Sequence, residues 1–340
     1  SHNYVAEEVK AVRTAVGATE IANFAKHEFT GAGARKFLDY ILAGKIPKPG
    51  RIILTPMLTP KGKLYGDLTI SCLNEEKFML FGSGAAQEMH RRWFEKFLPK
   101  KGVVYKNKSD DFHGIAISGP NSRELLSKIC RDDVSNEALK FRDTKETFVG
   151  GVPVILNRIS FSGELGYEIY TAPQFHLKLF EEIEYFGKDL NLKFYGSRAL
   201  MSLRLEKNWG AWTLDFRPDF TAAESGLDIF INWNKDFIGK EASLNEKKQG
   251  IKKKLVVMTI DTKDIDVSND EAILKDNKCV GYVTSGGYAH HSKKSMALGY
   301  VPVELSKHET SLDVEINGNL YKAYVTDRPL YDANGGKMKS

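Results

Sequence analysis

The sequence predicts an α+β protein of several domains that ends in an all-β barrel. Its 340 residues exceed the roughly 250 to 300 that a single hydrophobic core serves. Strands and helices alternate in two similar halves up to about residue 248, and only strands and turns follow. We therefore expect a first region over residues 1–248, made of two discontinuous α+β subdomains, and a β-barrel domain over residues 249–335.

Hydrophobic periodicity predicts the elements of the first two halves. In the first half they are helices over 5–18 and 29–42, strands over 52–58, 63–72 and 77–81, and a helix over 85–98. In the second half they are a strand over 113–118, a helix over 122–130, strands within 147–161 and over 166–171, and helices over 173–186 and 197–206.

The barrel is predicted from short strands separated by turn residues. Asn317-Gly318-Asn319 separates the last two strands, and Asn-Gly between alternating segments is a strong hairpin signal. The six expected strands cover 255–260, 272–275, 279–284, 296–303, 314–316 and 320–325.

Composition excludes several classes of protein. Apolar residues make up 42% and charged residues 27%, which is ordinary for a globular chain and excludes disordered and fibrous classes. The net charge of +5 is small and evenly spread, so no nucleic-acid partner is expected. No stretch reaches the roughly 18 apolar residues of a membrane span, and the first residues show no signal-peptide pattern. We expect a cytoplasmic protein with no membrane partner.

Three features that could indicate a cofactor or metal do not form a complete motif. Gly82-Ser83-Gly84 follows a strand and opens a helix, but the third glycine of a dinucleotide fingerprint is missing, so no FAD is expected in this chain. Cys72, Cys130 and Cys279 are far apart and form no CxxC pair. His290-His291 lies in a loop without spaced carboxylates, which favours an exposed loop over a metal site. No metal is expected.

Asp67 is the first candidate functional residue. The predicted strand over 63–72 places Tyr65, Asp67 and Thr69 on one face. Aspartate is unfavourable within strands, so its place there needs an explanation. It either faces a ligand or lies exposed to solvent at a sheet edge, and the strand pattern leaves both readings open.

Glu168 and Arg204 are the second and third candidates. Glu168 follows a tight turn and lies between apolar neighbours, where a carboxylate could bind an amidine-like edge through two parallel hydrogen bonds. Arg204 lies near the end of the helix over 197–206 and could hold a carboxylate-bearing ligand. Taken singly, each could equally be an ordinary salt-bridge partner.

Nine short motifs follow one another over almost the whole chain. They occupy 57–62, 66–69, 118–120, 162–168, 202–207, 224–228, 236–240, 283–286 and 297–302. In this order they resemble the folate-binding aminomethyltransferase family, which includes the glycine cleavage T-proteins. The resemblance is closer still to the C-terminal folate half of dimethylglycine and sarcosine dehydrogenases.

The resemblance implies a cloverleaf-like fold whose central hole holds tetrahydrofolate with its pterin inward. Asp67 falls on the family's catalytic aspartate and Glu168 on the glutamate that grips the pterin edge. Tyr65, Thr69 and Gly82 are expected beside the pterin, and Arg204 on the folate side. Phe161 stands where many relatives have tyrosine, so it keeps a stacking surface without a hydroxyl.

The implied function is a tetrahydrofolate-dependent transferase that places a one-carbon unit on folate. Asp67 is then an electrostatic and general-base group, because the nucleophile is the folate itself. The small-molecule donor is either an iminium from a flavoprotein partner or a soluble compound such as dimethylsulfoniopropionate. Phe24, Trp212 and His290 are the candidates for the donor side. The alternatives are a folate-binding module without catalysis and the detached folate half of a flavin-dependent dimethylglycine or sarcosine dehydrogenase.

Overall fold

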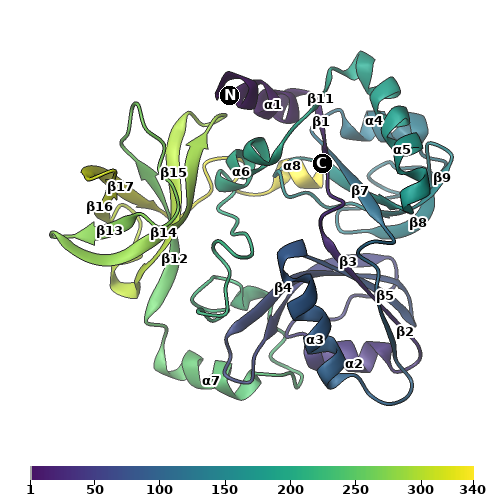
Figure 1. The fold of residues 1–340 in the computed structure, drawn as a ribbon, viewed down its shortest axis with the longest axis horizontal. Helices are drawn as coiled ribbons and strands as arrows, with labels where there is room; N and C mark the ends of the chain where they lie inside the picture. The colour runs from purple at the N-terminus through teal and green to yellow at the C-terminus, as the bar shows by residue number, and fades with distance from the viewer. Residues whose placement is uncertain (1) are drawn as a thin grey trace.

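The computed structural model describes residues 2–340 and contains three lobes around a central region (Figure 1). One lobe is built on a five-stranded sheet, one on a six-stranded sheet, and the third is a closed six-stranded barrel. The predicted α+β fold with several domains and a C-terminal β-barrel is therefore confirmed. The division of the chain at residue 248 stays a prediction.

The first lobe is an antiparallel sheet with two helices on one face. Apolar residues of its second strand, Leu68 and Ile70, are buried together with Leu38 and Phe94 of the helices. The alternate residues Asp67 and Thr69 therefore belong to the other face. In sheet order the strands are β3 (Arg51–Leu58), β4 (Leu64–Asn74), β5 (Lys77–Gly82), β2 (Ala25–Thr30) and β6 (Val104–Asn107), and the helices are α2 (Ala34–Ile41) and α3 (Gln87–Phe97).

The second lobe is a six-stranded sheet that packs one face on two helices. Its strands in sheet order are β11 (Leu192–Phe194), β1 (Val16–Glu20), β7 (His113–Ser118), β10 (Gly166–Thr171), β9 (Val152–Asn157) and β8 (Thr144–Val149), and its helices are α4 (Ser122–Ile129) and α5 (Pro173–Gly187). Gly150 and Gly151 form the tight turn between β8 and β9 with φ of +59° and +76°, values that favour glycine at both positions.

The third lobe is the barrel. Its strands in order around the barrel are β12 (Lys253–Ile260), β15 (Lys294–Pro302), β14 (Lys278–Ala289), β13 (Ala272–Lys275), β16 (Ser311–Ile316) and β17 (Asn319–Thr326). The remaining helices are α1 (His2–Thr14), α6 (Ser197–Leu205), α7 (Lys240–Gln249) and α8 (Gly336–Lys339), and short 3₁₀ helices cover Gly84–Ala86, Lys188–Leu190, Asp228–Phe230 and Val303–Leu305.

Residues 206–239, here called the central segment, run between α6 and α7 through the middle of the molecule (Figure 1). The backbone of this segment is hydrogen-bonded to two lobes, since Leu64 of β4 donates to Phe220 O and Leu255 of β12 donates to Glu224 O. A buried arginine, Arg13 of α1, adds ion pairs to Glu164 and Glu206 at 3.0 and 2.7 Å. These contacts fix the lobes against the centre.

Several predicted elements are wrong in extent. The helix expected over 5–18 ends at Thr14, and Val16–Glu20 is a strand because it pairs with β7 on one side and β11 on the other. The helix expected over 29–42 is likewise preceded by β2 and begins only at Ala34. The sequence analysis missed β6, β11 and α7. Among residues 2–340, no helix is both long enough and apolar enough to cross a bilayer.

Candidate functional site

Asp67 lies near the start of β4, which is not an edge strand in this sheet. Its side chain is half-buried, and desolvation raises its pKa to about 7, with a further contribution from the negative charge of Asp215. Asp67 is therefore recessed in the protein, but a ligand can still reach its carboxyl group. No other side chain of the described residues donates a hydrogen bond to it. Its carboxylate is therefore available to a ligand.

Thr69 belongs to a row of side chains across three strands. In this row Thr69 of β4 is paired with Phe81 of β5, which is paired with Lys26 of β2. Tyr170 of the second lobe stacks on Phe81 with ring centroids 4.5 Å apart. Lys26 is fully buried, and burial lowers its pKa to about 8. The row brings the first sheet into contact with the second.

Glu168 lies on β10, two residues before Tyr170 and on the same face. Its Oε2 accepts a hydrogen bond of 2.9 Å from the Tyr170 hydroxyl, and burial raises its pKa to about 7. The side chain is 8% exposed and forms no ion pair with any described residue. The salt-bridge reading of Glu168 therefore has no support, while the stacked Tyr170 and Phe81 link Glu168 to the Thr69 row.

Arg204 lies on α6 and is 1% exposed. Its Nη1 donates to the Asp215 carboxylate at 2.8 Å and to the carbonyl of Trp209 at 2.9 Å. Arg204 thus does form a salt bridge, but with one nitrogen only. Nε is buried without a partner, and no hydrogen bond of the described residues uses Nη2. The Nε–Nη2 edge is the one that pairs bidentately with a carboxylate or bonds a carbonyl, and it is free.

Three further expected cofactor-binding residues have different surroundings. Phe161 lies beyond the end of β9, not within a strand as predicted, and its ring lies parallel to that of Trp209 at 5.9 Å. The ring of Tyr65 lies 4.3 Å from that of Trp93 on α3, so it packs on the helix-covered face of the sheet. The prediction that Tyr65 shares a face with Asp67 and Thr69 is therefore wrong, because β4 is irregular where it begins. Gly82 ends β5, and a Cβ there would lie 2.5 Å from Leu68 Cδ2, which explains the glycine by packing.

The three expected donor-side residues fall into three separate clusters. Phe24 packs against the apolar cluster that contains Phe81 and Tyr170. Trp212 of the central segment is 8% exposed, and its ring centroid lies 5.8 Å from that of His90. His290 is half-buried beside Tyr288, and its backbone N–H donates to Ser202 Oγ. No ring contact among the described residues joins any two of the three.

The sequence analysis missed Asp215, Tyr170 and His90. Tyr170 could have been found from strand alternation, because it follows Glu168 by two residues. His90 is buried on α3 and donates through Nε2 to the Tyr65 carbonyl at 2.8 Å, and burial lowers its pKa to about 4. Asp215 lies in the irregular central segment, where no periodicity marks it.

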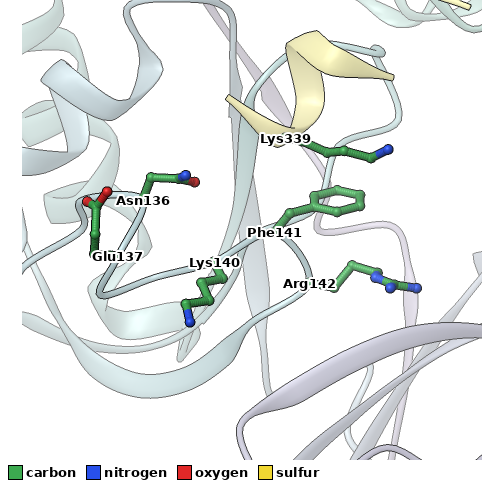
Figure 2. Close-up of a pocket in the computed structure, with 6 residues that line it drawn as sticks. All are labelled: Asn136, Glu137, Lys140, Phe141, Arg142 and Lys339. Atoms are coloured by element: carbon green, nitrogen blue, oxygen red, sulfur yellow. The ribbon is translucent and has the colours of Figure 1, made fainter. Parts of the chain in front are cut away.

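Surface pockets lie apart from these residues. One of about 480 Å³, shown in Figure 2, is lined by Asn136, Glu137, Lys140, Phe141, Arg142 and Lys339. A second of about 440 Å³ lies beside Phe180 and Phe194. Neither is lined by Asp67, Glu168 or Arg204, so the recessed carboxylates mark a better candidate site than either pocket. Within residues 2–340, no group of three or more His, Cys, Asp or Glu side chains is arranged to hold a metal ion.

The two raised carboxyl pKa values predict how stability depends on pH. Since Glu168 has a pKa of about 7 when folded and an ordinary value of 4.5, the folded state holds the proton over that interval. Stability is therefore highest at low pH in this range and falls as pH rises towards 7, by about 2 to 3 kcal/mol from Glu168 alone. Asp67 acts in the same direction. Chemical denaturation without ligand from about pH 5 to 8 should show the fall in wild type and a flatter curve in Glu168→Gln, and equal slopes would contradict it.

Comparison with known proteins identifies what the chain is similar to. Two family models match, described as the GCVT N-terminal domain over residues 1–235 and the glycine cleavage T-protein C-terminal barrel domain over residues 253–332. The human mitochondrial dimethylglycine dehydrogenase is 37% identical over 331 residues, which cover 96% of this chain and 38% of that protein. The chain thus spans less than half the length of that relative.

Two other similarities cover nearly the full length of both proteins. An aminomethyltransferase of Desulfitobacterium hafniense (strain Y51) is 30% identical over 334 residues, which cover 97% of this chain and 91% of the relative. The crystal structure of the glycine cleavage system aminomethyltransferase T from Bartonella henselae superposes with a TM-score of 0.88 at 23% identity and covers 97% of this chain and 90% of that chain. The structural likeness supports the fold.

Proposed function

Because the chain belongs to the aminomethyltransferase family of the glycine cleavage T-proteins, we propose that it transfers a one-carbon unit from a small-molecule donor to tetrahydrofolate. The observation that carries the proposal is the pair of recessed carboxyl groups, Asp67 and Glu168, each with a pKa near 7 and without a cationic partner. Carboxyl groups held in this state are typical of functional sites.

The residues present fit a folate. Glu168 is buried, and its Oε1 has no hydrogen-bond partner among the described residues. The Glu168 carboxylate can therefore accept two parallel hydrogen bonds, one on each oxygen, from an amidine-like pterin edge. The unpaired Nε of Arg204 is suited to a carbonyl or carboxylate of the same ligand. Phe161 and Trp209 offer parallel aromatic faces. Tetrahydrofolate would supply the amine nitrogens that accept the one-carbon unit.

Asp67 is the proposed catalytic residue. With a pKa of about 7, it is partly ionised at neutral pH and can either accept a proton or stabilise positive charge on the donor. The Asp215 charge contributes to this value. A carboxylate in a recessed position also acts more strongly than one in bulk water, because the surrounding medium screens it less.

The donor is proposed from the relatives. Dimethylglycine dehydrogenase is more than twice as long as this chain, so most of that oxidising enzyme lies outside the matched region. We propose that a separate flavoprotein oxidises a methylated amine to an iminium, and that this iminium is the donor. An unoxidised N-methyl group is a poor electrophile and should not react without such a partner. A sulfonium such as dimethylsulfoniopropionate is the alternative donor, since its methyl carbon is already activated by positive charge.

The purified chain is incubated with tetrahydrofolate and one donor at a time: dimethylglycine, sarcosine or dimethylsulfoniopropionate. Each incubation is run with and without a flavin-dependent dehydrogenase. We expect methylene-folate from a methylated amine only when the flavoprotein is present, and above the level that the flavoprotein and folate give alone. Methyl-folate from the sulfonium without a partner would favour the alternative donor. No folate product above background under any condition would contradict the transferase and favour a binding module.

A further inference from the structure

Asp215 of the central segment is held from all sides. It is 0% exposed, and its carboxylate accepts four hydrogen bonds. Oδ2 accepts from Arg204 Nη1 at 2.8 Å and from the backbone N–H of Ala211 at 2.9 Å. Oδ1 accepts from the hydroxyls of Thr284 and Ser285. A buried charge satisfied in this way has one defined position.

Thr284 and Ser285 are consecutive residues of the barrel strand β14, and both reach the same oxygen. Neighbouring residues of a regular strand point to opposite faces. Here β14 is irregular: Val283 pairs with Gly299 of β15, while Ser285 pairs with the next residue, Leu298, so Thr284 is an extra residue in a β-bulge. A bulge of this kind re-aims side chains. The bulge lets two hydroxyls converge on Asp215.

A third barrel residue holds the backbone of Asp215. The Tyr300 hydroxyl of β15 donates to the Asp215 carbonyl at 2.9 Å and also bonds Ser225 Oγ at 2.7 Å. Three barrel side chains thus fix one residue of the central segment. Apolar packing alone could hold the barrel against the central segment. The hydrogen bonds from Thr284, Ser285 and Tyr300 therefore serve to hold Asp215 itself.

Asp215 in turn acts on two residues of the candidate site. It holds Arg204 through Nη1, which leaves the Nε–Nη2 edge directed elsewhere. Burial is the main cause of the raised pKa of Asp67, and the negative charge of Asp215 adds to it. The charged or titratable groups in contact with Asp215 are Arg204 of α6 and Tyr300 of β15. Tyr300 in turn is influenced by Glu224 and Tyr282.

We propose that Asp215 is a positioning residue through which the C-terminal barrel fixes the Arg204 guanidinium and adds negative charge to the surroundings of Asp67. The inference rests on the proposed function for its effect on folate, but not for its effect on Asp67. It assigns a role to the Val283–Gly286 motif: the barrel acts on the site through Asp215.

The first test uses Asp215→Asn in the full chain without ligand. Carboxyl ¹³C NMR of aspartate-labelled protein follows the titration of Asp67, with Asp67→Asn to assign the signal. Removal of the neighbouring charge should lower the Asp67 midpoint by a measurable amount. Asp313→Asn, which changes a barrel aspartate paired with Lys322, is the matched control and should not shift it. An unchanged Asp67 midpoint in Asp215→Asn would overturn the proposal, whether or not the protein binds folate.

The second test uses Thr284→Val with Ser285→Ala, which removes the barrel hydroxyls and keeps the Arg204–Asp215 ion pair. Titration with tetrahydrofolate should show a Kd about three- to tenfold weaker than wild type. Val314→Ala, a cavity in the barrel core away from Asp215, lowers stability and should leave the Kd unchanged. If Val314→Ala loses as much affinity as the Thr284→Val, Ser285→Ala variant, the two hydroxyls stabilise the fold and do not position the site. If wild-type protein binds no folate, the proposed function fails and the Asp67 titration alone decides.

Discussion

Asp67→Asn should lower turnover by about 100-fold or more, while the Kd for tetrahydrofolate changes only a few-fold. The amide has nearly the same shape as the carboxyl group but cannot take a proton or carry negative charge, so a general-base contribution is lost. A pKa of about 7 means that wild-type activity should also fall as Asp67 becomes protonated below neutral pH. The measurement is the rate of folate product formed with the active donor as a function of pH.

The matched control for this variant is Asp236→Asn, which makes the same chemical change at a side chain that is 93% exposed. It should keep wild-type turnover and the wild-type pH profile. A loss of affinity for tetrahydrofolate in Asp67→Asn with unchanged turnover of bound ligand would show that Asp67 binds the folate and does not act in the reaction.

Glu168→Gln should weaken tetrahydrofolate by about 1.5 to 3 kcal/mol, the range for a hydrogen bond to a charged group, or roughly 10- to 150-fold in Kd. Glutamine keeps one acceptor for the Tyr170 hydroxyl but replaces the second with a donor, which opposes the donors of an amidine-like edge. Calorimetric titration measures the loss.

The pH dependence of binding separates this role from a structural one. Because the wild-type pKa is about 7, Glu168 is mostly protonated below that pH and must lose this proton before it can accept two hydrogen bonds. Wild-type affinity should therefore weaken as pH falls from 8 to 6. Glu168→Gln should show no such trend. Glu184→Gln, on the exposed surface of α5, should behave as wild type. Lower stability of Glu168→Gln at about pH 8 with unchanged affinity would make Glu168 a structural residue.

The sequence predicted the lobes better than their first elements. Residues 5–18 carry a helical pattern of apolar residues, yet Val16 and Ala18 are buried in a strand because two other strands pair with them. Such pairing depends on residues more than 90 positions away, which local periodicity does not contain. The barrel was easier, because three of its six strand pairs, β13–β14, β14–β15 and β16–β17, join consecutive strands through recognisable turns.

Some residues of the candidate site could likewise be predicted from the sequence, and others could not. Asp67 and Glu168 lie on strands, where an acidic residue among apolar neighbours is visible in the sequence. Asp215 lies in irregular chain, and its importance comes from a bulge in β14 and from an arginine on α6, neither of which the sequence around it reveals. Residues on regular strands can be identified from pattern, whereas a buried carboxylate held by a helix and by a strand of another lobe requires the structure.

Titration of the wild-type chain with tetrahydrofolate in a calorimeter is the most direct test of the account. A folate site at Glu168 predicts saturable binding of one folate per chain. The affinity should improve as pH rises through about 7, because Glu168 must be ionised to accept both hydrogen bonds. No detectable heat up to millimolar tetrahydrofolate, confirmed by an unchanged melting temperature, would contradict a folate site between these carboxylates.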